Sequence, residues 1–189
     1  IMKVKVFHIG MPKTGTTTIQ RFLKWDNRIN VIRTRYFNTS DSIISDFKIK
    51  SSGDHETSII SNENIILYGD TGGELYNTLK NIKEYNPDAK IIVTIREQRN
   101  MLVSRYKYSI PFYDGFSLSF KEWFGTDQGM NYFSVSQFAS LFKTINAFFP
   151  KENIHFMLFE EMVEDVESFL KKFYQLCGVE LSSEQFNKL

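Results

Sequence analysis

The sequence contains a single cysteine, Cys177, and few histidines (His8, His55 and His155). One thiol excludes both a disulfide within the chain and a zinc site built from cysteines. Histidine ligands of a metal usually lie at short, regular spacings, and these three are far apart along the chain. The sequence therefore predicts no metal site, and Cys177 is interpreted as a buried structural thiol.

Long apolar runs and a strong net charge are also missing. The formal net charge of +1 gives no overall field that would attract nucleic acid or a membrane surface. No stretch approaches the roughly 20 apolar residues of a membrane-spanning helix, and the N-terminus lacks a signal-peptide pattern. We therefore expect a cytoplasmic protein with no membrane span and no nucleic-acid partner.

The sequence does contain enough apolar material for one sizeable core. The chain has 189 residues, of which 42% are hydrophobic and 15% are aromatic. This length and this composition are typical of a single globular domain. We therefore treat residues 1–189 as one domain and expect most of the aromatic side chains in its core.

The most informative stretch runs from Val4 to Leu23. An apolar run ends at Ile9, a turn follows over residues 10–15 (GMPKTG), and apolar residues then recur with helical spacing. This pattern predicts a strand, a tight loop and a helix. Free backbone N–H groups and a partial positive charge mark a helix N-terminus, glycines allow close approach, and Lys13 adds a full charge. The stretch therefore predicts a cradle for phosphate or sulfate.

This loop departs from the nucleotide-binding motif G-x-x-x-x-G-K-[ST]. Gly10 and Gly15 have the right separation, but Thr16 stands at the lysine position and the lysine lies at position 13. A nucleotide kinase or ATPase would be expected to keep its lysine after the second glycine. Residues 12–17, P-K-T-G-T-T, instead resemble the loop that binds the 5′-phosphosulfate of PAPS (3′-phosphoadenosine 5′-phosphosulfate) in sulfotransferases.

A second stretch predicts another strand, turn and helix. The β-branched run over residues 89–96 is typical of a central parallel strand, and a helix is expected from Gln98 to Tyr108. Arg96 and Ser104 could reach one anion from such a unit. The pair resembles the arginine and serine with which sulfotransferases hold the 3′-phosphate of PAPS, with Gln98 at the position where animal members commonly have proline.

Glu63 is the candidate general base. It follows a short strand predicted at residues 57–61, and ligands of open parallel sheets bind beyond the carboxyl ends of the strands. Glu63 is therefore expected to face the same cleft as Lys13, where partial desolvation would raise its pKa toward a useful value. Its position also resembles the glutamate base of several carbohydrate-modifying sulfotransferases. His8 and His55 are the alternative bases.

The rest of the chain continues an alternating α/β pattern. The spacing of apolar residues predicts helices at 74–85, 134–149 and 166–176 and a strand at 153–159. Residues 26–57 show no convincing periodicity and are a candidate acceptor-facing insertion. Residues 110–131 are predicted to be a loop region rich in aromatic side chains, which either roofs the acceptor site or forms a satellite core.

The pattern as a whole predicts an α/β fold, a P-loop NTPase-like three-layer α/β/α sandwich around a parallel sheet of four or five strands. The resemblance implies in-line transfer of the sulfuryl group from PAPS, without a metal, to a hydroxyl or amine of a small-molecule or carbohydrate acceptor. It assigns Lys13 and Glu63 to catalysis. The residues that it assigns to the cofactor are Lys13, Thr14, Gly15, Thr16, Thr17, Thr18, Arg96 and Ser104.

Two other functions stay open at this point. Asp70, after an apolar run, could supply the Mg²⁺-binding acid of a P-loop kinase for small metabolites, although the displaced lysine argues against it. The basic, glycine-containing loop that closes over the 3′-phosphate near the C-terminus of sulfotransferases has no counterpart before Leu189. The domain is therefore either truncated there or closed differently, and an inactive nucleotide-binding module of the same fold is the second alternative.

Overall fold

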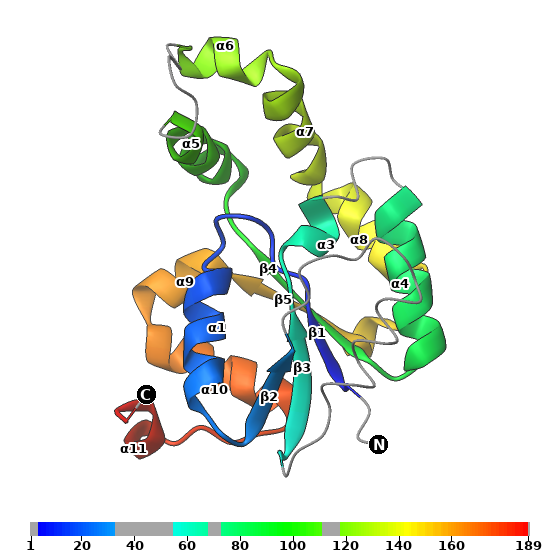
Figure 1. The fold of residues 1–189 in the computed structure, drawn as a ribbon, viewed down its shortest axis with the longest axis vertical. Coiled ribbons are helices and arrows are strands. Elements are labelled where there is room, and N and C mark those ends of the chain that lie inside the picture. Colours follow the sequence, from blue (N-terminus) through cyan, green and yellow to red (C-terminus); the bar gives the residue numbers. More distant parts are fainter. Residues whose placement is uncertain (1–3, 33–54, 68–72, 111–117, 189) are drawn as a thin grey trace.

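The computed structural model describes residues 4–32, 55–67, 73–110 and 118–188 (Figure 1). Five strands form one sheet in the order β2-β3-β1-β4-β5, and every neighbouring pair is parallel. Their bounds are β1 Val6–His8, β2 Ile29–Ile32, β3 Thr57–Ser61, β4 Lys90–Ile95 and β5 Ile154–Leu158. The predicted parallel sheet of four or five strands is therefore confirmed.

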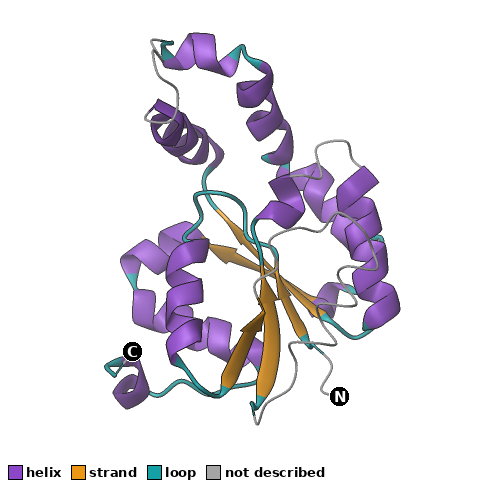
Figure 2. Cartoon of the chain, viewed as in Figure 1, coloured by secondary structure: helices purple, strands orange, loops and turns teal. Residues whose placement is uncertain are grey.

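Helices cover both faces of this sheet (Figure 2). The longer helices are α1 Thr16–Trp25, α4 Gly73–Tyr85, α5 Gln98–Ser109, α7 Asp127–Val135, α8 Phe138–Asn146 and α10 Val166–Cys177. The shorter ones are α3 Asn64–Leu67, α6 Phe120–Phe124, α9 Phe159–Glu164 and α11 Ser183–Phe186, and a 3-10 turn, Lys151–Asn153, precedes β5. The molecule is thus the expected three-layer α/β/α sandwich.

Two apolar layers separate the helices from the sheet. In β4, Ile91 and Val93 pack into the layer beneath α4 and α8, whereas Ile92 packs into the layer beneath α1 and α10. Alternate side chains of a strand point to opposite faces, so burial on both faces requires a continuous apolar run. This explains why the β4 segment reads as unbroken β-branched sequence.

The order of the strands creates a switch point at β1. This strand lies between β3 and β4, while α1 and α4 lie on opposite faces of the sheet (Figure 1). The connections on the two sides of β1 therefore diverge and leave a crevice at its carboxyl end. In open α/β sheets this crevice is the usual place for a ligand.

The edge strand β2 is absent from the sequence-based prediction. Ile29–Ile32 lies inside residues 26–57, for which no regular structure was expected. A segment of four residues is too short for its sequence pattern to predict a strand. Here the strand forms because its backbone pairs with β3, starting with Ile29 opposite Thr57. Residues 33–54, which make up most of the predicted acceptor-facing insertion, lie outside the described residues.

The prediction of a loop over residues 110–131 is wrong for its second half. Helices α6 and α7 form there, with a capping box between Ser119 and Glu122 and with Thr126 as the N-cap of α7. Trp123 is fully buried and its ring contacts Tyr106 of α5. This contact agrees with the satellite-core reading of the region. Helices α5, α6 and α7 project from the carboxyl edge of the sheet (Figure 1).

The single helix predicted at residues 134–149 is also interrupted. Helix α7 ends at Val135, and α8 begins at Phe138. Ser136 is buried and its hydroxyl donates to the carbonyl oxygen of Phe133, 2.7 Å away. A serine that bonds to the local backbone competes with helix continuation, which accounts for the break.

Candidate active site

The loop between β1 and α1 leaves the central strand and turns sharply into the helix. The N–H groups of Ile9 and Met11 donate to the carbonyl oxygens of Ile92 and Thr94 at 2.9 and 3.0 Å, so the loop begins as an extension of the sheet. Lys13 then adopts a φ of 64° and Gly15 a φ of 78°. Two left-handed residues within three positions reverse the chain direction and aim the first turn of α1 at the crevice.

The glycines of the loop are required by close packing. A Cβ at Gly10 would lie 2.5 Å from Oγ1 of Thr16 and 2.6 Å from Oγ1 of Thr94. A Cβ at Gly15 would overlap the methyl group of Met162 on α9. The sequence suggested that these glycines admit an anion, and the structure adds a second reason that depends on contacts between distant segments.

The N-terminus of α1 has little internal compensation for its partial positive charge. The N-cap Gly15 offers no side-chain acceptor, and the first turn contains no acidic residue. Its N–H groups are therefore available to an anion. Thr16 has a buried hydroxyl with no hydrogen-bond partner among the described residues, and Thr17 is exposed beside the crevice.

The other two threonines of the loop are oriented differently. The Thr14 side chain is fully buried, and its hydroxyl donates to the carbonyl oxygen of Met11 at 2.5 Å. Only the backbone of Thr14 is therefore left for a ligand. Thr18 is exposed on α1 and does not line the crevice.

The crevice contains a cavity of about 380 Å³. Its lining residues are Pro12, Lys13, Gly15, Thr16, Thr17, Glu63, Arg96, Ser104, Arg105, Tyr108 and Phe159. The loop after β1, the segment after β3, the end of β4, helix α5 and the start of α9 all contribute. Lys13, Glu63, Arg96 and Ser104, which are far apart in sequence, thus meet at one cavity as the sequence predicted.

Arg96 joins the end of β4 to the loop. Its Nη1 donates to the carbonyl oxygen of Lys13 at 3.2 Å, and its guanidinium lies 4.4 Å from the centre of the Phe159 ring. Its Nε is buried and has no hydrogen-bond partner among the described residues. A half-buried guanidinium with an unused donor beside a cavity is a suitable ligand for a phosphate.

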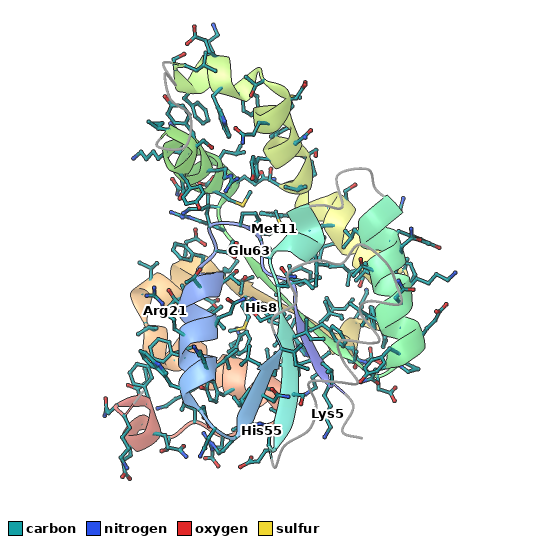
Figure 3. All side chains as sticks on the ribbon, viewed as in Figure 1. Lys5, His8, Met11, Arg21, His55 and Glu63 are labelled. Carbon is teal, nitrogen blue, oxygen red and sulfur yellow. The ribbon has the colours of Figure 1, made fainter. Side chains whose placement is uncertain are left out.

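Glu63 faces the same cavity from the end of β3 (Figure 3). Its side chain is half-buried, and this burial raises the pKa of the carboxyl group, while the charges of Arg105 and Lys13 act to lower it. The raised pKa strengthens the basicity of the carboxylate, and the two cations favour its ionised form. This environment suits a general base.

Three lining residues were not identified from the sequence. Arg105 lies between two tyrosine rings, with its guanidinium 5.1 Å from the centre of Tyr108 and 4.1 Å from that of Tyr132. Tyr108 also lies under Nζ of Lys13, at 4.6 Å, and Phe159 lies under Arg96. The adjacency of Arg105 to Ser104 was the only sequence signal, because the ring contacts depend on how α5 and α7 pack.

The histidines do not line the cavity. His8 is fully buried, and burial lowers its pKa to about 3. His55 precedes β3 and lies at the opposite edge of the sheet from Glu63 (Figure 3), where its Nδ1 is 2.7 Å from the carbonyl oxygen of Asn27. Cys177 is buried, and burial raises the pKa of its thiol. Its interpretation as a structural residue agrees with this position.

The described ranges contain no group of three or more histidine, cysteine, aspartate or glutamate side chains arranged to hold a metal ion. Asp70, the candidate magnesium ligand of the kinase alternative, lies outside these ranges. In the same part of the chain, no helix has both the length and the apolar composition needed to cross a membrane.

The family described as the sulfotransferase domain matches residues 3–189. The fold is similar to that of a sulfotransferase from Alicyclobacillus acidocaldarius, with a TM-score of 0.75 and 16% identity, covering 100% of this chain and 90% of that one. It is also similar to a mouse sulfotransferase complexed with PAP, with a TM-score of 0.64 and 18% identity, covering 99% of this chain and 64% of that one. These likenesses confirm the predicted P-loop NTPase-like α/β fold.

One curated relative has a name that describes a different kind of protein. It is an uncharacterized HTH-type transcriptional regulator of Methanocaldococcus jannaschii, 29% identical over 104 residues. The match covers 52% of this chain and 43% of that protein, so the chain spans less than half the length of the curated relative.

Proposed function

The chain belongs to the sulfotransferase domain family, and from this membership we propose that it transfers the sulfuryl group of PAPS to a hydroxyl or amine acceptor. The observation that carries the proposal is the single cavity in which Lys13, Glu63, Arg96 and Ser104 meet. Lys13 and Arg96 supply positive charge for the phosphates of the donor, and Glu63 supplies a carboxylate for the proton of the acceptor. Arg105 adds a third positive charge to the lining. The PAP bound to the mouse sulfotransferase of the same fold supports the choice of donor.

In this proposal the loop and the first turn of α1 hold the 5′-phosphosulfate. The free N–H groups over residues 14–18 donate to its oxygens, and the exposed hydroxyl of Thr17 is available to add a further contact. Lys13 stabilises the negative charge that develops on the leaving 5′-phosphate. Electrostatic stabilisation of this kind, from preorganised donors, is commonly the largest contribution to phosphoryl-type transfer.

Arg96 and Ser104 bind the 3′-phosphate of the donor in the same proposal. Arg96 directly follows β4, Ser104 lies in the second turn of α5, and both line the cavity. Arg96 brings a delocalised charge and an unused Nε donor, whereas Ser104 brings one hydroxyl. A nucleotide gripped at both phosphates is oriented before reaction, which reduces the entropic part of the barrier.

Glu63 acts as the general base. It takes the proton of the acceptor as the acceptor oxygen or nitrogen bonds to sulfur, and the bond from sulfur to the 5′-phosphate oxygen breaks to release PAP. Its raised pKa and its place beside Lys13 support this role. By resemblance, a glutamate base favours a carbohydrate or another hydroxyl compound as the acceptor.

A thermal-shift titration with PAP, run beside ATP with Mg²⁺, tests the proposal. A ligand that binds only the folded protein raises the unfolding midpoint. We expect a shift with PAP that is lost in Arg96→Ala. A shift with ATP and Mg²⁺ alone would favour a P-loop kinase. PAP binding without turnover of PAPS by any acceptor would identify an inactive nucleotide-binding module.

A further inference from the structure

A chain of buried side chains runs beneath the phosphate loop. Nδ1 of His8 lies 2.8 Å from Oγ of Ser61, and Nε2 of His8 lies 3.2 Å from Oγ1 of Thr94. Thr94 in turn lies 2.8 Å from Oγ1 of Thr14. His8, Thr94 and Thr14 are each 0% exposed and Ser61 is 2% exposed. Most polar groups that are buried this deeply in proteins have a hydrogen-bond partner, and each member of this chain has one.

The hydrogen bonds in this chain of buried side chains can all be formed with only one assignment of donors and acceptors. The amide of Gln20 on α1 donates to Oγ of Ser61 at 3.1 Å, which leaves the serine proton for Nδ1 of His8. At the other end of this chain of side chains, the hydroxyl of Thr14 donates its proton to the carbonyl oxygen of Met11. Thr14 must therefore accept from Thr94, and Thr94 must accept from Nε2–H of His8.

The opposite tautomer leaves one contact without a proton. If Nδ1 carried the hydrogen, Nε2 would accept the proton of Thr94, and no proton would remain between the oxygens of Thr94 and Thr14, which are 2.8 Å apart. Two such oxygens repel each other. The geometry therefore requires a neutral His8 with its hydrogen on Nε2, and the strongly lowered pKa of the imidazole agrees with the neutral form.

This chain of buried side chains touches three of the segments that bear candidate site residues, namely the loop after β1 and the ends of β3 and β4. Ser61 ends β3 two positions before Glu63, Thr94 lies in β4 two positions before Arg96, and Thr14 follows Lys13 directly. We infer that His8 is a positioning residue whose Nε2–H tautomer, acting through Ser61 and Thr94, holds the phosphate loop and the two strand ends in the arrangement that binds the donor. This inference rests on the proposed function, because it concerns the geometry of the proposed donor site.

The chain of buried side chains also supports the strained conformation of the loop. Lys13 has a positive φ, which few residues other than glycine adopt, so the loop needs support from its surroundings. The bonds from Thr14 to Met11 and from Thr94 to Thr14 brace the loop on both sides of Lys13. A loop that the protein itself holds in place loses less conformational entropy when PAP binds.

The tautomer can be tested without any substitution. In a ¹⁵N-labelled sample at about pH 7, long-range ¹H–¹⁵N spectra distinguish a protonated ring nitrogen from a bare one. We expect His8 to show hydrogen on Nε2 and a bare Nδ1. Hydrogen on Nδ1, or on both nitrogens, would overturn the inference, and this result does not depend on whether PAP binds.

The coupling to the loop is tested with Thr94→Val, which removes the bridging hydroxyl at nearly constant volume. Thr94→Ser keeps the hydroxyl and is the rescue variant. Thr57→Val is the matched control, because the Thr57 hydroxyl is buried in β3 with no hydrogen-bond partner among the described residues. Calorimetry with PAP should give a Kd raised about tenfold in Thr94→Val, within about twofold in Thr94→Ser, and unchanged in Thr57→Val.

Amide hydrogen exchange at Met11 and Ile19, whose N–H groups donate to the carbonyl oxygens of Thr94 and Gly15, distinguishes a loss of loop support from a general loss of stability. We expect faster exchange there in Thr94→Val than in Thr57→Val, with or without PAP. A Thr94→Val protein that unfolds at a lower midpoint but keeps its exchange protection and its PAP affinity would reduce the chain to a structural role and overturn the inference. If the unaltered protein fails to bind PAP, the proposed function fails, while the tautomer and the exchange rates still decide the coupling.

Discussion

Nη1 of Arg96 donates to the carbonyl oxygen of Lys13 across 3.2 Å, so this hydrogen bond joins the end of β4 to the phosphate loop. The two residues are 83 positions apart, and each brings a positive charge to the same cavity. Because Arg96 contacts the loop backbone, its removal affects both the charge of the cavity and the support of Lys13.

Arg96→Ala should therefore weaken PAP binding strongly. A charge-assisted hydrogen bond contributes about 1.5–3 kcal/mol, so we expect the Kd of PAP to rise by at least about tenfold in calorimetry. Arg99→Ala is the matched control, since Arg99 is exposed on α5 and does not line the cavity. Equal losses in both variants would point to a general loss of positive charge and would contradict a specific contact.

Glu63→Gln should abolish most turnover while leaving donor binding intact. Removing a general base typically lowers kcat by about 10²–10⁴-fold, whereas the amide occupies nearly the same volume. The measurement is PAP release from PAPS, with the best acceptor from a panel of sugars, phenols and amines. Glu164→Gln, a change at an exposed glutamate outside the cavity, is the control. Turnover near the normal rate in Glu63→Gln would remove Glu63 from this role.

The pH dependence of turnover follows from the same carboxylate. A base must be ionised, so activity should rise with pH as Glu63 loses its proton, with a midpoint above the ordinary value of 4.5 because burial raises the pKa. This acidic limb should be missing from the residual activity of Glu63→Gln. A limb that persists unchanged in the variant would belong to another group.

Substitution of two glycines that have nearly the same φ should lower the free energy of unfolding by different amounts. Gly15 and Gly178 have φ values of 78° and 79°, but a Cβ at Gly178 would meet no atom within 4 Å, whereas one at Gly15 would overlap Met162. In urea unfolding we expect Gly178→Ala to cost about 1–2 kcal/mol from the left-handed conformation alone. Gly15→Ala should cost clearly more, and equal costs would show that α9 yields to the added methyl group.

His8 should make the protein less stable in mild acid. Its pKa is lowered from 6.5 to about 3 by burial, so the unfolded chain binds a proton that the folded chain does not. The contribution of the neutral His8 to the free energy of unfolding is fully present above about pH 6.5. It is lost as the pH falls toward 3, by at most about 1.4 kcal/mol per pH unit. Denaturant titrations between about pH 6 and pH 4 measure this slope.

The control for this slope is the variant His8→Gln, which cannot take up the proton. Its stability should fall less steeply over the same range, even if it is lower throughout. The raised pKa of Glu63 acts in the opposite sense but is common to both proteins, so it cancels in the comparison. His155→Gln should leave most of the slope in place, because His155 is only partly buried. An unchanged slope in His8→Gln would contradict the assignment.

The parts of the fold that were predicted have strong local signals. The continuous apolar run of β4 and the glycine that ends α10 at Gly178 are visible in the sequence because burial on both faces and a left-handed cap each restrict residue choice. Strand β2 was missed because its order comes from pairing with β3. Helix α6 was missed although the capping-box pair, Ser119 and Glu122, is present in the sequence.

The candidate site divides in the same way. Lys13, Arg96 and Ser104 lie within recognisable loop and strand-end patterns, and the structure places them at one cavity with Glu63. The buried chain under the loop could not be predicted, because it depends on the register that sets His8 beside Ser61 on β3 and near Thr94 on β4. Likewise, the tyrosine rings around Arg105 come together only when α7 packs on α5.

The backbone of Lys13 has a consequence for engineering. A φ of 64° costs a residue with a side chain about 1 kcal/mol or more, and asparagine or glycine would adopt it more easily. Replacing Lys13 with asparagine or glycine would therefore relieve part of this conformational cost in the folded state. Such a change would be favoured in a selection for thermostability alone. In the proposed function it would also remove the charge opposite the leaving group. Libraries of this protein screened by heat resistance should accumulate inactive sequences at this position unless activity is screened as well.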